Sequence, residues 1–533
     1  MTFDVYDTTL RDGAQQEGMN LSVADKFAIA PLLDQLGVGF IEGGWPGAIP
    51  KDTEFFRRAR TELRLKNAVL AAFGSTRKAG VAVDQDPQVR ALLDAEAPVL
   101  TLVAKSDLRH VERALKTSRA EGLAMITDTV AFLVAESRRV VLDAEHFFDG
   151  FRFDPVFATD AARAAFDAGA EVITLCDTNG GMLPDMVTDV VTAVRAALGD
   201  AARLGIHAHN DTGCAVANSL AAVAAGATHV QGTVNGYGER TGNADLIAIA
   251  ANLELKQGRE LLADGGLRDA TRIAHAIAEI TNIAPFARQP YVGASAFAHK
   301  GGLHAAAIRV DPDLYQHTDP TFVGNDMRML VSDMAGRAAV ELKGKELGFD
   351  LAGQTALLSR VTQRVKEAEA VGYTYDAADA SFELVLREEL HGSLPTFFEV
   401  ESWRTIVETV PGQAQGRGAV ATAEATVKLH AGGERIVTTG EGNGPVDALD
   451  QGLRQALVRI YPEIERFELI DFKVRILDAE QGTDSITRVL IVTTDGERTW
   501  STVGVGPNLI EASWEALLEA YVYGLLRVGA GPR

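Results

Sequence analysis

Two hydrophobic periods alternate along the first half of the chain. Short apolar, β-rich segments fall at 3–7, 38–44, 68–74, 98–104, 140–145, 171–177, 204–209 and 228–234. Between them, segments such as 22–37 and 184–199 repeat apolar residues at i, i+3, i+4 and i+7, the period of a helix with one buried face. Eight strands alternating with helices over about 250 residues predict a (β/α)8 TIM-type barrel over residues 1–264. A doubly wound α/β sheet is the alternative, but it usually needs fewer strands.

The pattern changes between residues 265 and 395. Helical stretches such as 361–372 alternate there with loops rich in Gly, Asp and Pro, such as 310–326. We expect a helical linker region that carries one or two functional loops, without a continuation of the strand repeat.

Residues 396–533 return to β-rich segments, at 421–433, 435–442, 467–480, 487–496 and 498–506. The motif G-x-G-P begins at Gly442 and again at Gly504, each time at the end of a strand and before an amphipathic helix. This repeat indicates an internal duplication. In each copy the proline suits the first turn of a helix, where its missing N–H costs nothing. We expect a compact α+β domain with pseudo-twofold symmetry. It holds no cluster of titratable groups, which favours a regulatory or dimerising role over catalysis.

Composition narrows the classes of partner. A hydrophobic content of 47% and a charged content of 23% are those of a globular protein, and the formal charge of −22 argues against nucleic acid or an anionic membrane as a partner. Two cysteines, Cys176 and Cys214, cannot form a disulfide framework, and we expect small core residues rather than nucleophiles. The N-terminus lacks a signal-peptide pattern, and no apolar stretch reaches spanning length. These features predict a soluble cytoplasmic protein.

Unusual polar residues gather where the predicted barrel strands end, which is where barrel enzymes place their chemistry. They are Asp7 to Gly13, Glu42, Glu145, Asp177, Thr178, His207 to Asp211, and Gly236 to Asn243.

The H-x-H pair His207 and His209 is the most informative of these features. Residues two apart on a strand point to the same face, so both imidazoles enter one space at the barrel mouth. Asp12 and Asn243, at neighbouring strand ends, complete a site suited to a divalent Mg, Mn, Co or Zn ion. The alternative is a pair of core histidines bonded to carboxylates.

Two further residues are candidates on weaker grounds. Arg11 is either a salt-bridge partner or a permanent cation that stabilises an enolate or alkoxide beside the metal. His304, which follows a glycine pair in HKGGLHAAA, is a candidate base, although a single histidine in a helical region is usually structural. The G-x-G-P segments favour turns before helices over phosphate cradles.

Four ordered motifs resemble one known family across essentially the whole chain. They are LRDGAQ followed by ten residues and Lys26, LGIHAHNDTGCA, GERTGNADL and FAHKGGLHAAA. Together they resemble the isopropylmalate, homocitrate and citramalate synthase family, and the terminal G-x-G-P domain resembles that family's regulatory domain.

The resemblance assigns roles to individual residues. It implies a metal site of Asp12, His207, His209 and Asn243; substrate contacts from Arg11, Gln15 and Thr178; and catalytic roles for Arg11, Glu145, His304 and Tyr315. We also expect Glu42, at the end of the second strand, to contact the substrate. His304 and Tyr315 would reach the barrel of a partner subunit, so the resemblance implies a homodimer.

The reaction implied is a Claisen-type condensation. The metal polarises the ketone of a 2-oxo acid, His304 with Glu145 deprotonates acetyl-CoA, Arg11 stabilises the new alkoxide, and thioester hydrolysis drives the reaction forward. The segment 41–52, IEGGWPGAIPKD, resembles the long-chain citramalate synthases, which use pyruvate in isoleucine synthesis. Isopropylmalate synthases, which use 2-oxoisovalerate in leucine synthesis, more often show a glycine-phenylalanine-proline loop.

Three alternatives and two open points remain. The alternatives are an isopropylmalate synthase, a barrel-family lyase, and a non-enzymatic amino-acid sensor. The lyases are usually barrel-only chains, and a sensor would leave Asp12, His207, His209 and Arg11 without a purpose. Isoleucine is the effector expected from the family at the C-terminal domain. Lys105, Arg77 and Arg109, which lie near strand ends, are candidate contacts for CoA.

Overall fold

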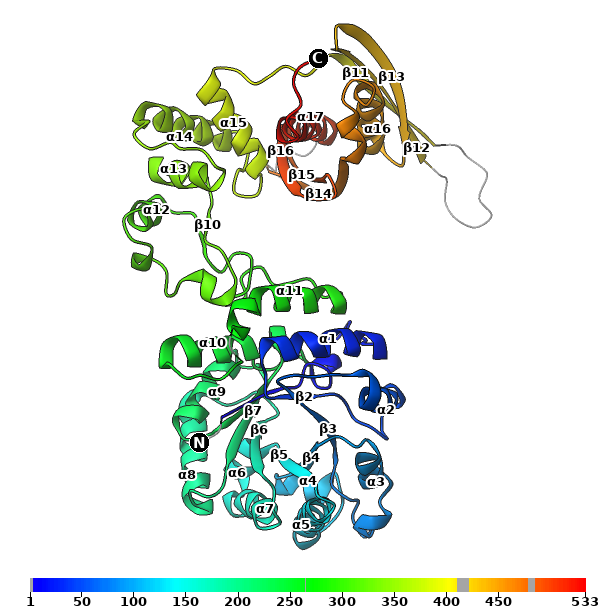
Figure 1. Ribbon diagram of the computed structural model, residues 1–533, viewed down its shortest axis with the longest axis vertical. Coiled ribbons are helices and arrows are strands. Elements are labelled where there is room, and N and C mark those ends of the chain that lie inside the picture. The colour runs from blue at the N-terminus through cyan, green and yellow to red at the C-terminus, as the bar shows by residue number, and fades with distance from the viewer. Residues whose placement is uncertain (1–2, 264, 410–420, 478–484) are drawn as a thin grey trace. The chain divides into compact units, whose positions relative to one another are not determined.

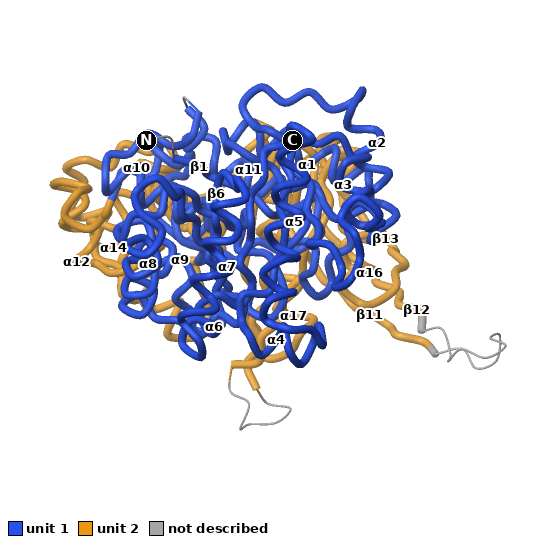
Figure 2. Tube along the Cα trace, turned by 90° about the horizontal axis from the view of Figure 1, so that it is seen from below, with its two compact units in different colours: residues 1–297, 318–326 blue, residues 298–317, 327–533 orange. Residues whose placement is uncertain are grey.

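The computed structural model describes residues 3–263, 265–409, 421–477 and 485–533. It divides into two compact units, coloured separately in Figure 2: residues 1–297 with 318–326, and residues 298–317 with 327–533. Among the described helices, none is long and apolar enough to cross a membrane.

The first unit is built on a closed parallel barrel of eight strands, so the (β/α)8 prediction is confirmed (Figure 1). The strands follow the chain in order, and β1 closes the barrel by pairing in parallel with β8, Asp4 to His229 through Asp7 to Gly232. They are β1 Asp4–Asp7, β2 Phe40–Glu42, β3 Val69–Ser75, β4 Val99–Lys105, β5 Arg139–Glu145, β6 Val172–Asp177, β7 Leu204–Ala208 and β8 His229–Gly232.

Helices surround this barrel, as Figure 1 shows. They are α1 Val23–Leu36, α2 Pro50–Glu62, α3 Pro87–Asp94, α4 Leu108–Arg113, α5 Arg119–Ala135, α6 Phe147–Phe153, α7 Pro155–Asp167, α8 Pro184–Leu198, α9 Ala215–Ala224, α10 Leu246–Gln257 and α11 Ala270–Thr281. Local signals set where they begin: Ser22 and Asp25 form a reciprocal capping box on α1, and a proline opens α2, α3, α7 and α8.

The barrel interior is layered, because alternate residues of each strand point inward. An apolar floor consists of Tyr6, Phe40, Ala71, Val99, Val141 and Val172. Along β5, Val141 lies in this floor, while Asp143 and Glu145 line the cavity at the mouth. The barrel is therefore closed at one end and polar at the other.

The second unit begins with short helices and two very short strands. Its helices are α12 Gly302–Ile308, α13 Arg337–Glu346, α14 Thr355–Ala370 and α15 Asp379–His391. The two-residue strands β9 Ala298–His299 and β10 Arg328–Met329 pair in parallel. These two strands do not continue the barrel repeat, and segments this short leave no periodic signal in the sequence.

The C-terminal part consists of two sheet-and-helix halves, as the duplication predicts. β11 Glu399–Thr409, β12 Ala421–Ala431 and β13 Glu434–Gly442 precede α16 Pro445–Leu457; β14 Glu468–Ile476, β15 Thr487–Thr494 and β16 Thr499–Gly506 precede α17 Leu509–Arg527. Both sheets are antiparallel meanders.

Three details of this part differ from the sequence predictions. The sequence pattern did not indicate β11. The segment predicted at 467–480 is a strand to Ile476, and residues 478–480 lie outside the described residues. Pro445 occupies the first turn of α16, but Pro507 precedes the cap residue of α17, Asn508, whose side chain accepts from two backbone amides instead.

Candidate active site and metal centre

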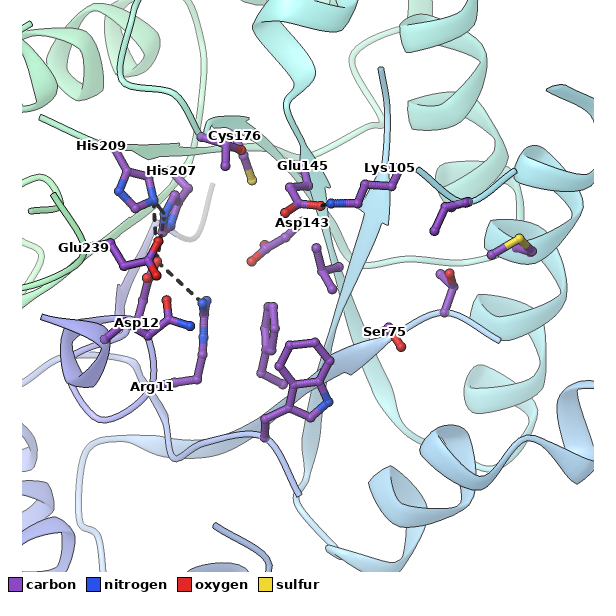
Figure 3. Close-up of a pocket in the computed structure, with 18 of the residues that line it drawn as sticks. Arg11, Asp12, Ser75, Lys105, Asp143, Glu145, Cys176, His207, His209 and Glu239 are labelled. Atoms are coloured by element: carbon purple, nitrogen blue, oxygen red, sulfur yellow. Dashed lines mark hydrogen bonds and ion pairs between the residues drawn. The ribbon is translucent and has the colours of Figure 1, made fainter. Parts of the chain in front are cut away.

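Three side chains converge at the mouth of the barrel, and they could hold a metal ion. The ligand atoms of Asp12, His207 and His209 lie within 4.8 Å of one another, and all three residues are buried. Oδ2 of Asp12 is 3.2 Å from Nε2 of His207 and 3.7 Å from Nε2 of His209, and the two nitrogens are 3.3 Å apart (Figure 3). Two ring nitrogens and one carboxylate oxygen all carry lone pairs and repel one another at these distances, unless a cation or a proton lies between them.

The pKa directions agree with this geometry. Burial alone would raise the pKa of Asp12, but the Arg11 guanidinium and the hydrogen bond from His207 bring it well below its usual range. Burial opposes a charge on His207, yet Asp12 raises its pKa, whereas burial and then His207 lower the pKa of His209 to about 4. Asp12 is thus an anion and His209 a neutral imidazole at neutral pH, which are the forms that bind metals.

Asn243 lies beside this triad through a backbone bridge to His209. Its Nδ2 donates to the carbonyl of Tyr237 at 2.9 Å, while its buried Oδ1 has no hydrogen-bond partner among the described residues. Gly238, at φ +147°, makes room for this amide, because a Cβ there would fall 2.2 Å from Asn243 Nδ2. A buried carbonyl oxygen without a partner, on a residue bridged to His209, fits a fourth donor for a divalent ion held by two imidazoles and a carboxylate.

Arg11 is held from two sides at the edge of the cavity. Its Nε donates to Oε2 of Glu42 at 2.5 Å, and its guanidinium carbon lies 3.8 Å from the centre of the Phe73 ring. Its Nη1 is 3.5 Å from Oδ2 of Asp12. The cation is therefore fixed directly beside the candidate metal ligands.

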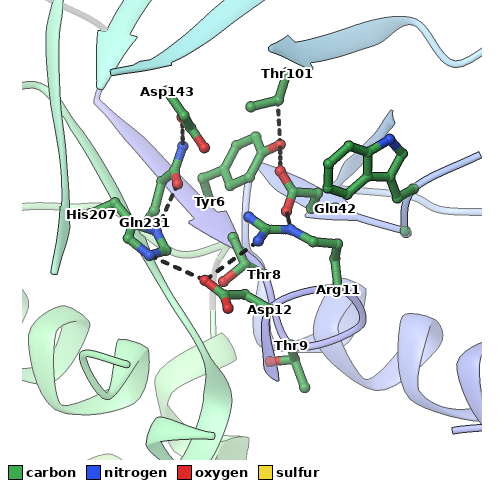
Figure 4. Close-up of polar contacts among 12 residues, drawn as sticks. Tyr6, Thr8, Thr9, Arg11, Asp12, Glu42, Thr101, Asp143, His207 and Gln231 are labelled. Carbon is green, nitrogen blue, oxygen red and sulfur yellow. Dashed lines mark hydrogen bonds and ion pairs between the residues drawn. The ribbon is translucent and has the colours of Figure 1, made fainter. Parts of the chain in front are cut away.

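Glu42 does not line the cavity; it lies behind Arg11. The residue is fully buried, and its other oxygen accepts from the Tyr6 hydroxyl at 2.8 Å, which in turn is 2.6 Å from the Thr101 hydroxyl (Figure 4). The expectation that Glu42 contacts the substrate is thus not supported, because both carboxylate oxygens are occupied by protein donors.

The other expected barrel residues line a single cavity of about 650 Å³ together with Arg11, Asp12, His207 and His209. Glu145 forms an ion pair with Lys105 at its wall. The Thr178 hydroxyl oxygen accepts from the His146 backbone amide at 2.9 Å, and Gln15 is exposed at the rim. This volume is in the range of small-molecule sites.

His304 and Tyr315 lie together in the second unit. Their ring centroids are 4.1 Å apart, and both side chains are exposed. The structure brings these two residues to each other. Their catalytic roles remain predictions.

The residues expected to contact CoA are all in ion pairs. Lys105 pairs with Glu145, Arg109 with Asp107, and Arg77 with both Glu121 and Asp128. Lys105 and Arg77 line the cavity and Arg109 does not.

The segment 41–52 is anchored by Lys26, the last residue of the first motif. Lys26 Nζ donates to the Gly43 carbonyl at 2.8 Å and to Asp52 at 2.5 Å, and Asp52 accepts from the Trp45 amide at 2.8 Å. Gly44, at φ +143°, would place a Cβ 2.4 Å from Asp52. This arrangement presents Trp45 to the cavity, edge-on to Phe73.

Several residues that line the cavity had no role assigned to them from the sequence. Asp143 precedes Glu145 by two positions on β5, so the same alternation rule that identified His207 and His209 could have found it. Arg240 forms a bidentate ion pair with Asp211 and donates to the Thr178 carbonyl. Cys176 is buried and lines the cavity, and burial raises the pKa of its thiol far above the usual value, which does not favour a nucleophile.

Comparisons with known proteins agree with this geometry. Residues 2–280 match the HMGL-like family model, residues 291–372 the homocitrate synthase post-HMGL domain-like model, and residues 376–525 the LeuA allosteric (dimerisation) domain model. An (R)-citramalate synthase from Streptomyces coelicolor is 63% identical, covering 100% of this chain and 98% of its own length. An (R)-citramalate synthase from Synechocystis is 47% identical, covering 99% and 97%, and a 2-isopropylmalate synthase from Dictyoglomus turgidum is 30% identical, covering 97% of each.

Identity of this extent, carried from the barrel to the C-terminal halves, goes with the same ordered motifs and with a barrel mouth able to hold a metal. The chain therefore belongs to the (R)-citramalate synthase family.

Proposed function

We propose that this protein condenses acetyl-CoA with pyruvate and that water hydrolyses the resulting thioester to give citramalate and free CoA, an acyltransferase reaction that serves isoleucine biosynthesis. The observation that carries the proposal is 63% identity to an (R)-citramalate synthase over the whole chain. The converging Asp12, His207 and His209 support it, since a 2-oxo acid offers a carboxylate and a ketone oxygen to such a centre.

Asp12, His207, His209 and Asn243 would hold the divalent ion, with Mn, Mg, Co or Zn compatible with two nitrogen and two oxygen donors. When bound, the ion supplies a Lewis acid for the acceptor ketone. Arg11 holds a permanent positive charge beside the oxygen that becomes an alkoxide, and Glu42 fixes its orientation. Thr178 and Gln15 orient the 2-oxo acid at the rim.

Glu145 and His304 are the proposed proton carriers. His304, which lies against the tilted ring of Tyr315, removes a proton from the acetyl methyl group, and Glu145 assists with its charge balanced by Lys105. From the family resemblance, both His304 and Tyr315 serve the barrel of a partner subunit in a homodimer. Mixing an Asp12→Asn dimer with a His304→Ala dimer should then restore activity that neither has alone, and no recovery after verified subunit exchange would contradict the shared site.

The C-terminal halves are the proposed site of feedback by isoleucine, with residues 1–264 catalytic and 265–395 linking. Ala380 and Leu384 of α15 belong to the same hydrophobic core as the C-terminal sheets, so removing residues 396–533 would strip α15 of its packing. The effector is better tested by titrating isoleucine against the full chain, with leucine and valine as controls.

A panel of 2-oxo acids tests the activity. With acetyl-CoA present and free thiol detected, pyruvate should release CoA fastest, and EDTA should abolish release until a divalent metal is restored. Faster release with 2-oxoisovalerate would identify a 2-isopropylmalate synthase instead, and release unaffected by EDTA would contradict the metal site.

A further inference from the structure

A chain of buried hydrogen bonds runs from the candidate metal ligand His207 across the barrel to Asp143. Nδ1 of His207 is 3.0 Å from Oε1 of Gln231, and Nε2 of Gln231 donates to Oδ1 of Asp143 at 2.8 Å (Figure 4). His207 and Gln231 lie side by side on β7 and β8, and Asp143 lies on β5. All three side chains are buried.

The surroundings of Gln231 fix the orientation of its amide. Besides Asp143, its nitrogen faces the Thr174 hydroxyl at 3.3 Å and Nε2 of His229 at 3.4 Å. Nδ1 of His229 faces the Asp4 carboxylate at 3.3 Å, so in the neutral ring Nε2 of His229 carries a lone pair. Exchanging the amide oxygen and nitrogen would set the oxygen against a carboxylate and an imidazole lone pair.

The fixed amide in turn selects one tautomer of His207. Oε1 of Gln231 is an acceptor, so the nitrogen opposite it, Nδ1, must carry the proton. In the neutral ring, the form that a metal ligand requires, the lone pair is then on Nε2, the atom that points at Asp12 and His209. A tautomer with the proton on Nε2 would present an N–H to the metal position and could not act as a ligand.

We propose that Gln231 and Asp143 are positioning residues for the metal centre, which hold His207 in the tautomer and ring orientation that ligates. The inference rests on the metal site of the proposed function and extends it to two residues that do not ligate the ion. Hydrogen-bond partners of metal-binding histidines typically change metal affinity or activity by about ten- to a hundredfold when replaced.

Metal affinity of the full-length protein, measured by Mn²⁺ titration with EPR detection, is the direct test. Gln231→Met keeps the side-chain length and removes both hydrogen bonds, and it should weaken Mn²⁺ binding by about ten- to a hundredfold. Asp143→Asn keeps an oxygen that can accept from Gln231 but no longer requires a donor there. We therefore expect a smaller loss of affinity.

Rescue separates positioning from general damage to the barrel. In the double variant Asp143→Asn with Gln231→Glu, the new carboxylate accepts from His207 Nδ1–H and from the new amide. It should bind Mn²⁺ more tightly than Asp143→Asn alone. Asn218→Leu is the matched control, because it also replaces a fully buried amide. Asn218 lies in α9, donates to the Met182 carbonyl and does not line the cavity, so this variant should leave Mn²⁺ affinity unchanged.

The outcomes are distinguishable from failure of the proposed function. Absence of Mn²⁺ binding in the parent protein would contradict the metal site itself. If the parent binds Mn²⁺ and Gln231→Met binds it as tightly as the double variant does, the positioning chain alone is overturned. Should Gln231→Met not fold, the double variant decides, because affinity no higher than that of Asp143→Asn also overturns the proposal.

Discussion

The mouth of the barrel and the core of the C-terminal halves both bury carboxylates, but they surround them differently. Asp450, in α16, accepts from the Tyr521 hydroxyl at 2.8 Å and pairs with Arg454, and Glu515, in α17, accepts from the Tyr373 hydroxyl and the Val505 amide. At the barrel mouth, Asp12 instead faces two imidazole nitrogens.

The difference indicates where a ligand belongs. Asp450 and Glu515 are each matched by donors from the protein itself, so these two carboxylates stabilise the fold without a ligand. Near Asp12, the buried Asn243 Oδ1 lacks a partner within the described part of the chain, and the Nε2 atoms of His207 and His209 both face the same carboxylate oxygen. Converging and unmatched polar atoms are a feature of a binding site, and burial alone is not.

The largest effect expected from this comparison is that of Asp12→Asn. The amide loses the negative charge between His207 and His209, so Mn²⁺ affinity and turnover should each fall by more than about a hundredfold, beyond the usual loss for partners that only support a ligand. Thermal unfolding of the metal-free protein should occur at a lower temperature, because the low pKa of Asp12 means that the folded state favours its carboxylate, so both quantities are measured on the folded protein. Turnover within tenfold of the parent would remove Asp12 from the metal site.

Arg11→Lys should have the next largest effect. Lysine keeps the charge but loses both the Nε–H to Glu42 and the planar stacking on Phe73. We expect kcat to fall by about a hundredfold, the scale of one lost oxyanion donor, with Mn²⁺ affinity nearly unchanged. A change confined to KM would assign Arg11 to ground-state binding.

Asp450→Asn makes the same carboxylate-to-amide change in the other region. It weakens the hydrogen bonds from Tyr521 and Arg454, so the free energy of unfolding should fall by about 1–3 kcal/mol. Mn²⁺ affinity and turnover per folded molecule should stay at the parent level. Denaturant unfolding and the same EPR titration measure both, and a loss of metal binding would erase the contrast between the regions.

Glu519→Gln should have the smallest effect, which is a change in how the free energy of unfolding depends on pH. Burial, followed by the charge of Glu515, raises the pKa of Glu519 to about 7, although Ser381 donates to it. The folded state then retains a proton that the unfolded chain releases near pH 4.3. The contribution of this proton to the free energy of unfolding is therefore fully present below that pH and is lost as the pH rises through 7.

Replacing Glu519 by Gln should therefore flatten stability between pH 5 and 7.5. Above pH 7 the variant should be more stable than the parent by about 1–2 kcal/mol, less than the full shift implies, because solvent reaches part of the side chain. Melting curves across this pH range check it, and parallel curves for parent and variant would contradict the raised pKa.

The sequence predicted the barrel well because periodicity is a local property. Each strand and helix has its own period, and the H-x-H pair needs only the two-residue alternation of one strand to share a face. The C-terminal duplication is likewise visible in repeated turn residues. Strand β11 was missed because none of its described side chains is buried, so its sequence, EVESWRTIVET, carries no clear alternation of apolar residues.

The contacts that give residues their roles could not be read from sequence. Glu42 and Asp143 both lie at inner positions of strands, yet one is enclosed by Tyr6 and Arg11, and the other faces the cavity. That difference depends on side chains from other strands, which no local pattern encodes. For the same reason Gln231 carried no signal until His207 and Asp143 were placed on either side of it.

Closure of β1 against β8 has a consequence for how the protein is made. Asp12 leaves the ribosome early, whereas His207, His209 and Asn243 emerge only after most of the barrel has been translated. The two groups meet when Asp4–Asp7 pairs with His229–Gly232. An ion that needs all of these residues can be bound only by the finished barrel. Because it would bind that form alone, it would stabilise the pairing between the first strand and the last.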